Sequence, residues 1–243
     1  MKPRRNRASF TLVAPLPQLL DRANSSPSRV PAGTPRQGFY TKWGKRTLDA
    51  VSSTIGLLVL LPLFAVVALC IKTTSRGAVF YRQIRIGRNG RPFRIVKFRS
   101  MDDVTSRTPG AITVSGDKRV TKVGRILRRH KVDELPQLWN VLRGEMSLVG
   151  PRPELPKYVA SYSPNQTSVL LVRPGITDPA SLIYRHEEEI LLRHENPEQV
   201  YRDHILPDKL ARNLTYIQNI SFRSDLRIIL ATIGRSFLGN QPR

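Results

Sequence analysis

The chain has 243 residues, with 40 Lys and Arg against 18 Asp and Glu, and therefore a formal net charge of +22 at pH 7. This length fits one domain with appendages and is enough to bury a real core. So positive a chain attracts polyanions, whether nucleotides, nucleic acid or an anionic membrane surface, and composition does not choose among them. A single cysteine, Cys70, excludes an internal disulfide framework and a cysteine zinc site, and it fits a reducing compartment.

The first 37 residues mix Arg, Pro, Ser and Asn without a sustained hydrophobic period, which predicts a disordered basic arm over 1–37. A cleaved signal peptide is not expected. The first long apolar run begins only after Lys45 and Arg46, and no small-residue cleavage pattern follows it. We therefore expect this apolar segment to remain in the mature protein.

No residue from 50 to 71 is charged, and 55–71 is almost wholly apolar. A helix needs roughly 20 apolar residues to cross a hydrocarbon core of about 30 Å, so this run is barely sufficient. Pro62, near its middle, removes a backbone hydrogen bond and bends the axis. Basic residues stand on both sides and leave no charge asymmetry to set an orientation: Lys42, Lys45 and Arg46 before, Lys72 and Arg76 after. A kinked span and a re-entrant hairpin both remain open from the residues alone.

The remainder of the chain predicts a mixed α/β (α+β) domain. Two β-favouring runs, 79–86 and 93–98, flank an Asn-Gly pair and predict a β-hairpin. Helical spacing follows at 120–129 and 134–142, which places Asp133 as the N-cap of the second helix, with Pro136 in its first turn. The later segments with helical patterns are 180–193, 197–204, 208–219 and 222–237.

The most informative segment is 133–154, where an acidic pair, Asp133-Glu134, precedes a Gly-Pro-Arg-Pro loop centred on Arg152. Adjacent carboxylates can supply one nucleophile and one metal ligand, and an arginine between prolines can present a planar fork to phosphate oxygens. An acidic pair alone is equally well read as a helix cap. The combination predicts a phosphoryl-transfer site.

Together with the Lys-Phe-Arg-Ser-Met run at 97–101 and the single hydrophobic segment, this block resembles the bacterial sugar transferase family, the monotopic phosphoglycosyl transferases. The resemblance covers about 42–175. After the predicted arm (1–37), it implies a lead-in and re-entrant membrane helix (38–72) and a cytoplasmic catalytic domain (73–243). It also implies that the enzyme transfers a hexose 1-phosphate from a UDP-sugar to undecaprenyl (polyprenyl) phosphate and releases UMP, as the first step of exopolysaccharide, O-antigen or glycoconjugate synthesis.

The resemblance assigns roles to individual residues. Asp133 corresponds to the nucleophile that forms an aspartyl-phosphosugar, and Glu134 to its acidic partner and the ligand of Mg²⁺. The expected substrate-binding cations are Lys97, Arg99, Arg128 and Arg152. For Lys97 and Arg99 the alternative is a solvated strand face, and for Arg128 it is a basic helix on anionic lipid.

Two further polar features receive no site role. Asp102-Asp103 is a rival metal ligand that we interpret as a solvated surface pair. We interpret His130 as a surface residue.

The chain departs from the family pattern after Thr177, where Asp178-Pro-Ala-Ser-Leu182 replaces the Gly-Leu-Trp-Gln of many members, so sugar recognition is expected to differ. No bundle of membrane helices precedes the hydrophobic segment, as in the small members. The expected partners are UDP-sugar, polyprenyl phosphate and membrane phospholipid at the bacterial inner membrane, with no nucleic acid. A homo-oligomer remains open. The rival hypotheses are a membrane-tethered nucleic-acid-binding protein, which the charge permits, and a scaffold without catalysis.

Overall fold

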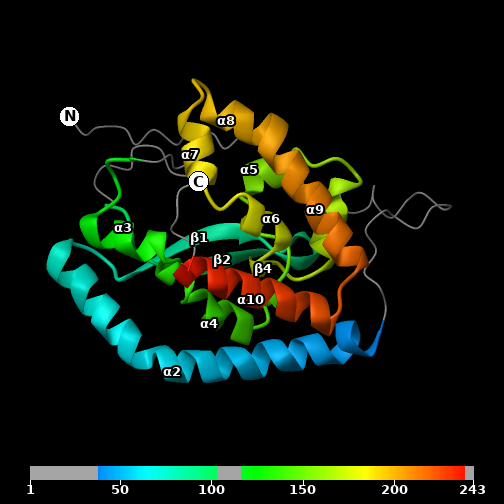
Figure 1. Cartoon of the computed structure of the whole chain (residues 1–243), viewed down its shortest axis with the longest axis horizontal. Helices are drawn as coiled ribbons and strands as arrows, with labels where there is room; N and C mark the ends of the chain where they lie inside the picture. Colours follow the sequence, from blue (N-terminus) through cyan, green and yellow to red (C-terminus); the bar gives the residue numbers. More distant parts are fainter. Residues whose placement is uncertain (1–37, 103–115, 239–243) are drawn as a thin grey trace, which may run out of the picture.

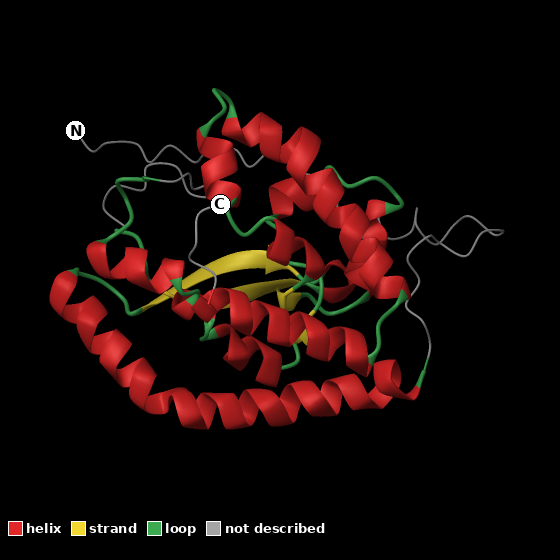
Figure 2. Ribbon diagram, in the orientation of Figure 1, coloured by secondary structure: helices red, strands yellow, loops and turns green. Residues whose placement is uncertain are grey.

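The computed structural model describes residues 38–102 and 116–238. The predicted arm at 1–37 and Asp103 lie outside these ranges. Figure 1 shows one long helix bowed along one side of a domain in which shorter helices surround small β-sheets, and Figure 2 shows the same arrangement by type of element. The expectation of a mixed helix and sheet fold is confirmed.

The long helix is α2 (Lys45–Thr74), which continues from a π-helix, η1 (Tyr40–Gly44). In the described part of the chain, 40–74 is the one helix long and apolar enough to cross a membrane. Pro62 lies inside α2, and the helix bends without being interrupted by a turn (Figure 1). The structure therefore has one continuous, bent helix where a helix hairpin was expected. Many of its apolar side chains are exposed: Val51, Ile55, Leu58, Val59, Leu61, Leu63, Val66 and Leu69.

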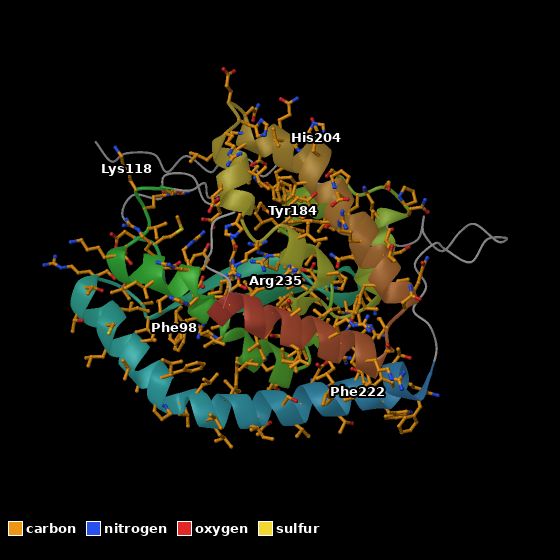
Figure 3. All side chains as sticks on the ribbon, viewed as in Figure 1. Phe98, Lys118, Tyr184, His204, Phe222 and Arg235 are labelled. Atoms are coloured by element: carbon orange, nitrogen blue, oxygen red, sulfur yellow. The ribbon has the colours of Figure 1, made fainter. Side chains whose placement is uncertain are left out.

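Both ends of α2 are fastened to the rest of the domain. Near the start, Arg46 donates hydrogen bonds to the carbonyl oxygens of Val141 and Leu142 (2.6 and 2.8 Å) and so satisfies a helix C-terminus that would otherwise lack donors. Near the end, Ile71 packs in an apolar cluster with Phe98, which is labelled in Figure 3. Arg46 was expected only as a basic flank of the membrane segment; the structure gives it an internal structural contact.

The predicted β-hairpin is confirmed. Strands β1 (Phe80–Ile86) and β2 (Pro92–Phe98) pair antiparallel, in register from Phe80 opposite Phe98 to Ile86 opposite Pro92. Asn89 and Gly90 both have positive φ, 55° and 70°, within the short 3₁₀ helix η2 (Arg88–Gly90) that connects the strands. Asparagine and glycine are the residues that tolerate this conformation best, which explains the turn.

A second sheet was not predicted. Strands β3 (Ser147–Val149) and β4 (Gly175–Thr177) pair in parallel. Each has only three residues, too few to show an alternating pattern in the sequence. Beyond the strand, the backbone of Gly150 touches Gly175 so closely that a Cβ on Gly175 would lie 2.1 Å from the Gly150 nitrogen. This contact requires glycine and fixes the start of the loop that carries Arg152.

Along the chain, three helices separate β2 from β3: α3 (Lys122–Arg129), the 3₁₀ helix η4 (Val132–Glu134) and α4 (Gln137–Leu142). After β3 come α5 (Pro156–Val159) and η5 (Gln166–Leu171), neither of which was predicted. The elements after β4 are α6 (Pro179–Ile183), α7 (Glu187–Leu192), α8 (Pro197–Val200), the π-helix η6 (Tyr201–Ile205), α9 (Leu206–Gln218) and α10 (Phe222–Leu238).

The last helix, α10, agrees with the prediction, and its ends are marked by Phe222 and Arg235 in Figure 3. Two other predictions were wrong. The single helix expected at 180–193 is divided into α6 and α7, because Tyr184 and His186 leave the helical conformation. The break expected between 204 and 208 is absent, since α8, η6 and α9 follow one another directly, with a proline in the first turn of α9, where it is tolerated. The main apolar core lies among these helices.

Candidate active site

The centre of the candidate site is Glu134, a carboxylate buried between two cations. Its Oε1 accepts hydrogen bonds from Lys97 Nζ and from Arg152 Nη2, each at 2.7 Å. Burial alone would raise the pKa of Glu134, but the charges of Arg152 and Lys97 outweigh it and hold the pKa well below its usual range. The structure therefore brings together three of the predicted site residues from β2, η4 and the Gly-Pro-Arg-Pro loop.

Asp133 does not cap a helix, so that prediction was wrong. It lies in η4, and α4 begins only at Gln137. The reason is Pro136, which has no N–H to donate to the Val132 carbonyl in the α-helical pattern; the Leu135 N–H donates to that carbonyl instead and closes a tighter 3₁₀ turn. The turn starts after Lys131, whose φ of 58° is unusual for a residue other than glycine.

Asp133 is nevertheless buried beside Glu134, with only 6% of its surface exposed. Its Oδ1 has no hydrogen-bond partner among residues 38–102 and 116–238. Burial raises the pKa of Asp133, and the neighbouring Glu134 charge raises it further, while the nearby cations Lys97, Lys131 and Arg128 oppose this shift. A buried carboxylate oxygen without a donor is costly in a folded protein and calls for a functional explanation.

Arg152 sits in a loop that other buried side chains hold in place. Arg85 of β1 donates from Nη1 to the Pro153 carbonyl at 3.1 Å, and the next residue, Glu154, accepts a 2.7 Å hydrogen bond from the Tyr201 hydroxyl. The charge of Glu134 raises the pKa of Arg152, so its guanidinium is charged at every relevant pH. Arg152 was predicted from the sequence, whereas Arg85 was not, because its contact joins two segments 68 residues apart.

Lys97 and Arg99 do not act on the same group. Lys97 binds Glu134, whereas Arg99 lies just past the end of β2 and donates from Nη2 to the carbonyl oxygen and the hydroxyl of Ser75, after α2. Arg99 is 3% exposed, which excludes the solvated strand face as its environment. The structure thus supports Lys97 at the centre of the site and places the Arg99 head group at the end of the apolar helix.

Arg128, in the last turn of α3, forms an ion pair with Glu188 of α7, and its charge still acts on Asp133. It is therefore at the edge of the site. Of the rival pair, Asp102 is exposed, and its backbone N–H donates a hydrogen bond to the Arg119 carbonyl. Asp178, which starts the segment that departs from the family pattern, caps α6 by accepting hydrogen bonds from the N–H and hydroxyl of Ser181.

A small open hollow adjoins the cluster and is lined by Arg85, Ile95, Lys97, Gln137, Arg152 and Pro153. Three of these six side chains are cationic, so the hollow suits an anionic group. Gln137, the first residue of α4, was not assigned a role from the sequence, although it stands in the same motif four residues after Asp133.

Within 38–102 and 116–238 no group of three or more His, Cys, Asp or Glu side chains could hold a metal ion by itself. Asp133 and Glu134 provide two adjacent carboxylates, and both cation contacts of Glu134 fall on one oxygen, Oε1. Mg²⁺ commonly binds one or two carboxylates and completes its shell with water and substrate phosphates. The donor set fits such an ion together with a phosphorylated substrate.

Comparison with known proteins now identifies the chain. Residues 40–239 match the sequence model of the family described as bacterial sugar transferase. The protein is therefore an enzyme of the transferase class. It belongs to the bacterial sugar transferase family, which confirms the resemblance inferred from the motif at 133–154.

Several known proteins are similar to it. A UDP-glucose:undecaprenyl-phosphate glucose-1-phosphate transferase of Klebsiella pneumoniae is 36% identical over 198 residues, 80% of this chain and 40% of that protein. One of the same name from Caulobacter vibrioides is 39% identical over 192 residues, 78% of this chain and 68% of that protein. The exopolysaccharide production protein ExoY of Rhizobium meliloti is 34% identical over 227 residues, 87% of this chain and 93% of that protein. The chain thus spans less than half of the first relative and nearly all of the third.

Proposed function

We propose that this protein transfers a hexose 1-phosphate from a UDP-sugar to undecaprenyl phosphate and releases UMP, as the initiating step in the synthesis of a surface polysaccharide or glycoconjugate. The observation that carries the proposal is the buried Asp133 oxygen without a donor, next to a carboxylate that Lys97 and Arg152 already neutralise. The names of the relatives support the donor and acceptor class.

In the first step, Asp133 Oδ1 attacks the phosphorus that bears the sugar. The bond from that phosphorus to the bridging oxygen breaks, and the bridging oxygen leaves as part of UMP. The phosphate of UMP carries the resulting negative charge, so no proton has to be supplied. In the second step, an oxygen of polyprenyl phosphate attacks the same phosphorus, and the Asp133 carboxylate is released. Two steps allow a soluble donor and a membrane-bound acceptor to use one site in turn.

The cations of the site make the first attack feasible. A carboxylate and a diphosphate repel each other, and that repulsion is strong where water is excluded. Lys97 and Arg152, which contact Glu134 in this structure, can also contact the phosphate oxygens of the donor and neutralise part of their charge. Arg152 can bind two of these oxygens at once through its planar guanidinium. Mg²⁺, when bound at Glu134 together with donor phosphates, would neutralise further charge.

The test is the release of UMP by the full-length protein in detergent or nanodiscs, with a panel of UDP-sugars, with and without undecaprenyl phosphate. We expect steady release to require acceptor, and double-reciprocal plots to be parallel, as in a ping-pong mechanism. Chelation of divalent metal should abolish turnover. Release of UMP at the same rate without acceptor would instead indicate hydrolysis.

We also propose that α2 enters and leaves one leaflet of the membrane, with the catalytic domain in the cytoplasm. Its exposed side chains between residues 55 and 70 are apolar, it is bowed (Figure 1) and contains Pro62, and both of its ends contact the same domain, through Arg46 and through Ile71. The catalytic domain therefore lies on the concave side of the bow (Figure 1). A helix with both ends on one domain cannot place them on opposite faces of a bilayer without loss of those contacts.

Cysteine labelling in intact cells tests this topology. In a Cys70→Ser background, a cysteine introduced at Ser9 should not react with an impermeant reagent. Pro62→Leu restores an unbroken apolar helix and should make part of the population reactive. Labelling of the parent arm would establish a full span, and the proposed chemistry would stand without the re-entrant geometry.

A further inference from the structure

A buried side-chain amide in the candidate site has no partner. Gln137 begins α4 and is 2% exposed. Its Nε2 makes no hydrogen bond within residues 38–102 and 116–238. It lines the hollow that Lys97 and Arg152 also line. A buried donor without an acceptor costs stability, so its retention needs a reason outside the folding of the chain.

Asn140, one turn further along α4, shows the contrasting case. Its Nδ2 donates to the Arg94 carbonyl at 2.8 Å and to Glu145 Oε2 at 2.7 Å, and its Oδ1 accepts from the Val96 N–H at 3.0 Å. Asn140 therefore has an evident structural role in joining α4 to β2. Of these two buried amides on one short helix, the fold therefore supplies partners for Asn140 Nδ2 and none for Gln137 Nε2 within the described residues.

The surroundings of Gln137 indicate which partner is missing. The hollow has room for a group about as large as a water molecule, and its charged lining consists of the cations Arg85, Lys97 and Arg152. An N–H donor among cations favours an anionic oxygen as its acceptor. We propose that the Gln137 amide donates a hydrogen bond to a non-bridging oxygen of the phosphoryl group that is transferred to Asp133.

This role rests on the proposed function and adds a residue to it. Negative charge is spread over the non-bridging oxygens while the phosphorus moves from the bridging oxygen of UMP to Asp133 Oδ1, and again when it moves to the acceptor. A donor that is fixed by burial costs no reorganisation when that charge develops. No bond is made or broken at Gln137, and no proton leaves it. Lys97 and Arg152 supply charge to the same group, and Gln137 supplies a neutral, directed donor.

The test compares Gln137→Met with Asn140→Leu in the full-length protein. Methionine has a similar length but no N–H, so Gln137→Met should keep its thermal midpoint or raise it, because the fold gives the amide nitrogen no partner. Its kcat for UMP release should fall about 100-fold, the loss typical of one donor to a developing oxyanion, with little change in KM for the donor. Asn140→Leu should lower the thermal midpoint, because it leaves the Arg94 carbonyl and the Val96 N–H unpaired.

Each result is decisive. A kcat for Gln137→Met within twofold of the wild type would overturn the role of Gln137 and leave the proposed function intact. A fall in its thermal midpoint as large as that of Asn140→Leu would show that Gln137 is structural, and would likewise overturn the role. Absence of UMP release from the folded wild-type protein, with every UDP-sugar tried, would overturn the proposed function and this role with it.

Discussion

Two buried carboxylates in this protein have opposite surroundings. Asp225 of α10 accepts hydrogen bonds at Oδ2 from the Tyr40 hydroxyl and Lys45 Nζ, and at Oδ1 from the Tyr216 hydroxyl at 2.6 Å. Both of its oxygens have partners. Asp133 is almost as deeply buried, yet its Oδ1 has none among the described residues.

We interpret Asp225 as a structural carboxylate and, in line with the proposed function, Asp133 as the reactive one. The Asp225 cluster joins the start of α2 to α9 and α10, and its geometry is complete without any other molecule. In the proposed mechanism, Asp133 Oδ1 gains a partner only when the phosphorus of the donor approaches it. Charge alone does not distinguish the two clusters, because each contains a carboxylate and a lysine. What distinguishes them is whether every carboxylate oxygen has a hydrogen-bond partner.

The largest effect is expected from Asp133→Asn. The amide cannot form the proposed covalent bond, so UMP release should fall by about 1,000-fold or more. The fold should be unaffected, because Oδ1 has no partner to lose. Steady-state assays and circular dichroism of the same preparation test both halves. Activity within tenfold of the wild type would remove Asp133 from its role.

Arg152→Lys should reduce kcat/KM for the UDP-sugar about 100-fold, equivalent to about 2.7 kcal/mol of transition-state stabilisation. Lysine keeps the charge and can still pair with Glu134, but it loses the planar fork that fits two phosphate oxygens. Arg202→Lys is the matched control, since Arg202 is exposed and forms a surface ion pair with Glu198. Near-wild-type efficiency of Arg152→Lys would refute bidentate recognition.

Asp225→Asn should affect stability instead of chemistry. It leaves Lys45 buried beside a neutral group, and breaking a buried ion pair in this way costs about 3 kcal/mol. Denaturant unfolding in detergent measures this loss. The fraction of protein that remains folded should keep its UMP release per molecule. A stable but inactive Asp225→Asn protein would contradict the division between the two clusters.

The smallest effect concerns the dependence of stability on pH. The cations Arg152 and Lys97 lower the pKa of Glu134, so its stabilising contribution is full above the pKa of an unfolded glutamate, about 4.3, and is lost as pH falls below that value toward the folded pKa. The raised pKa of Asp133 acts in reverse, because its ionised form costs stability above the folded pKa. At pH 7, Glu134→Gln should therefore be less stable than the wild type, and Asp133→Asn at least as stable. Both differences should shrink in unfolding titrations at pH 4 and below.

Local patterns in the sequence predicted those elements whose causes are local. The Asn89-Gly90 turn, the apolar run of α2 and the periodic helix α10 were recognisable because each carries its signal within a short window. The parallel pairing of β3 with β4 was not, since it joins two three-residue strands that lie far apart in the chain. The division of 180–193 into α6 and α7 also left no proline or glycine to mark it.

In the candidate site, too, the residues that share one motif were predictable, and the contacts between distant segments were not. Asp133, Glu134 and Arg152 stand in one motif, and the structure places Glu134 between Arg152 and Lys97. The position of Arg99 was not predictable, because it depends on the end of β2 and on the packing of α2 beside it. The unpartnered amide nitrogen of Gln137 could be recognised only once its neighbours were known.

The most direct test of the central claim is mass spectrometry of the wild-type protein incubated with UDP-sugar and Mg²⁺ but without acceptor. The intact mass should increase by one hexose phosphate, and peptide fragmentation should place the adduct on Asp133. Addition of undecaprenyl phosphate should remove it, and Asp133→Asn should never acquire it. An adduct on another residue, or acceptor-dependent turnover with no adduct at any time, would contradict the account.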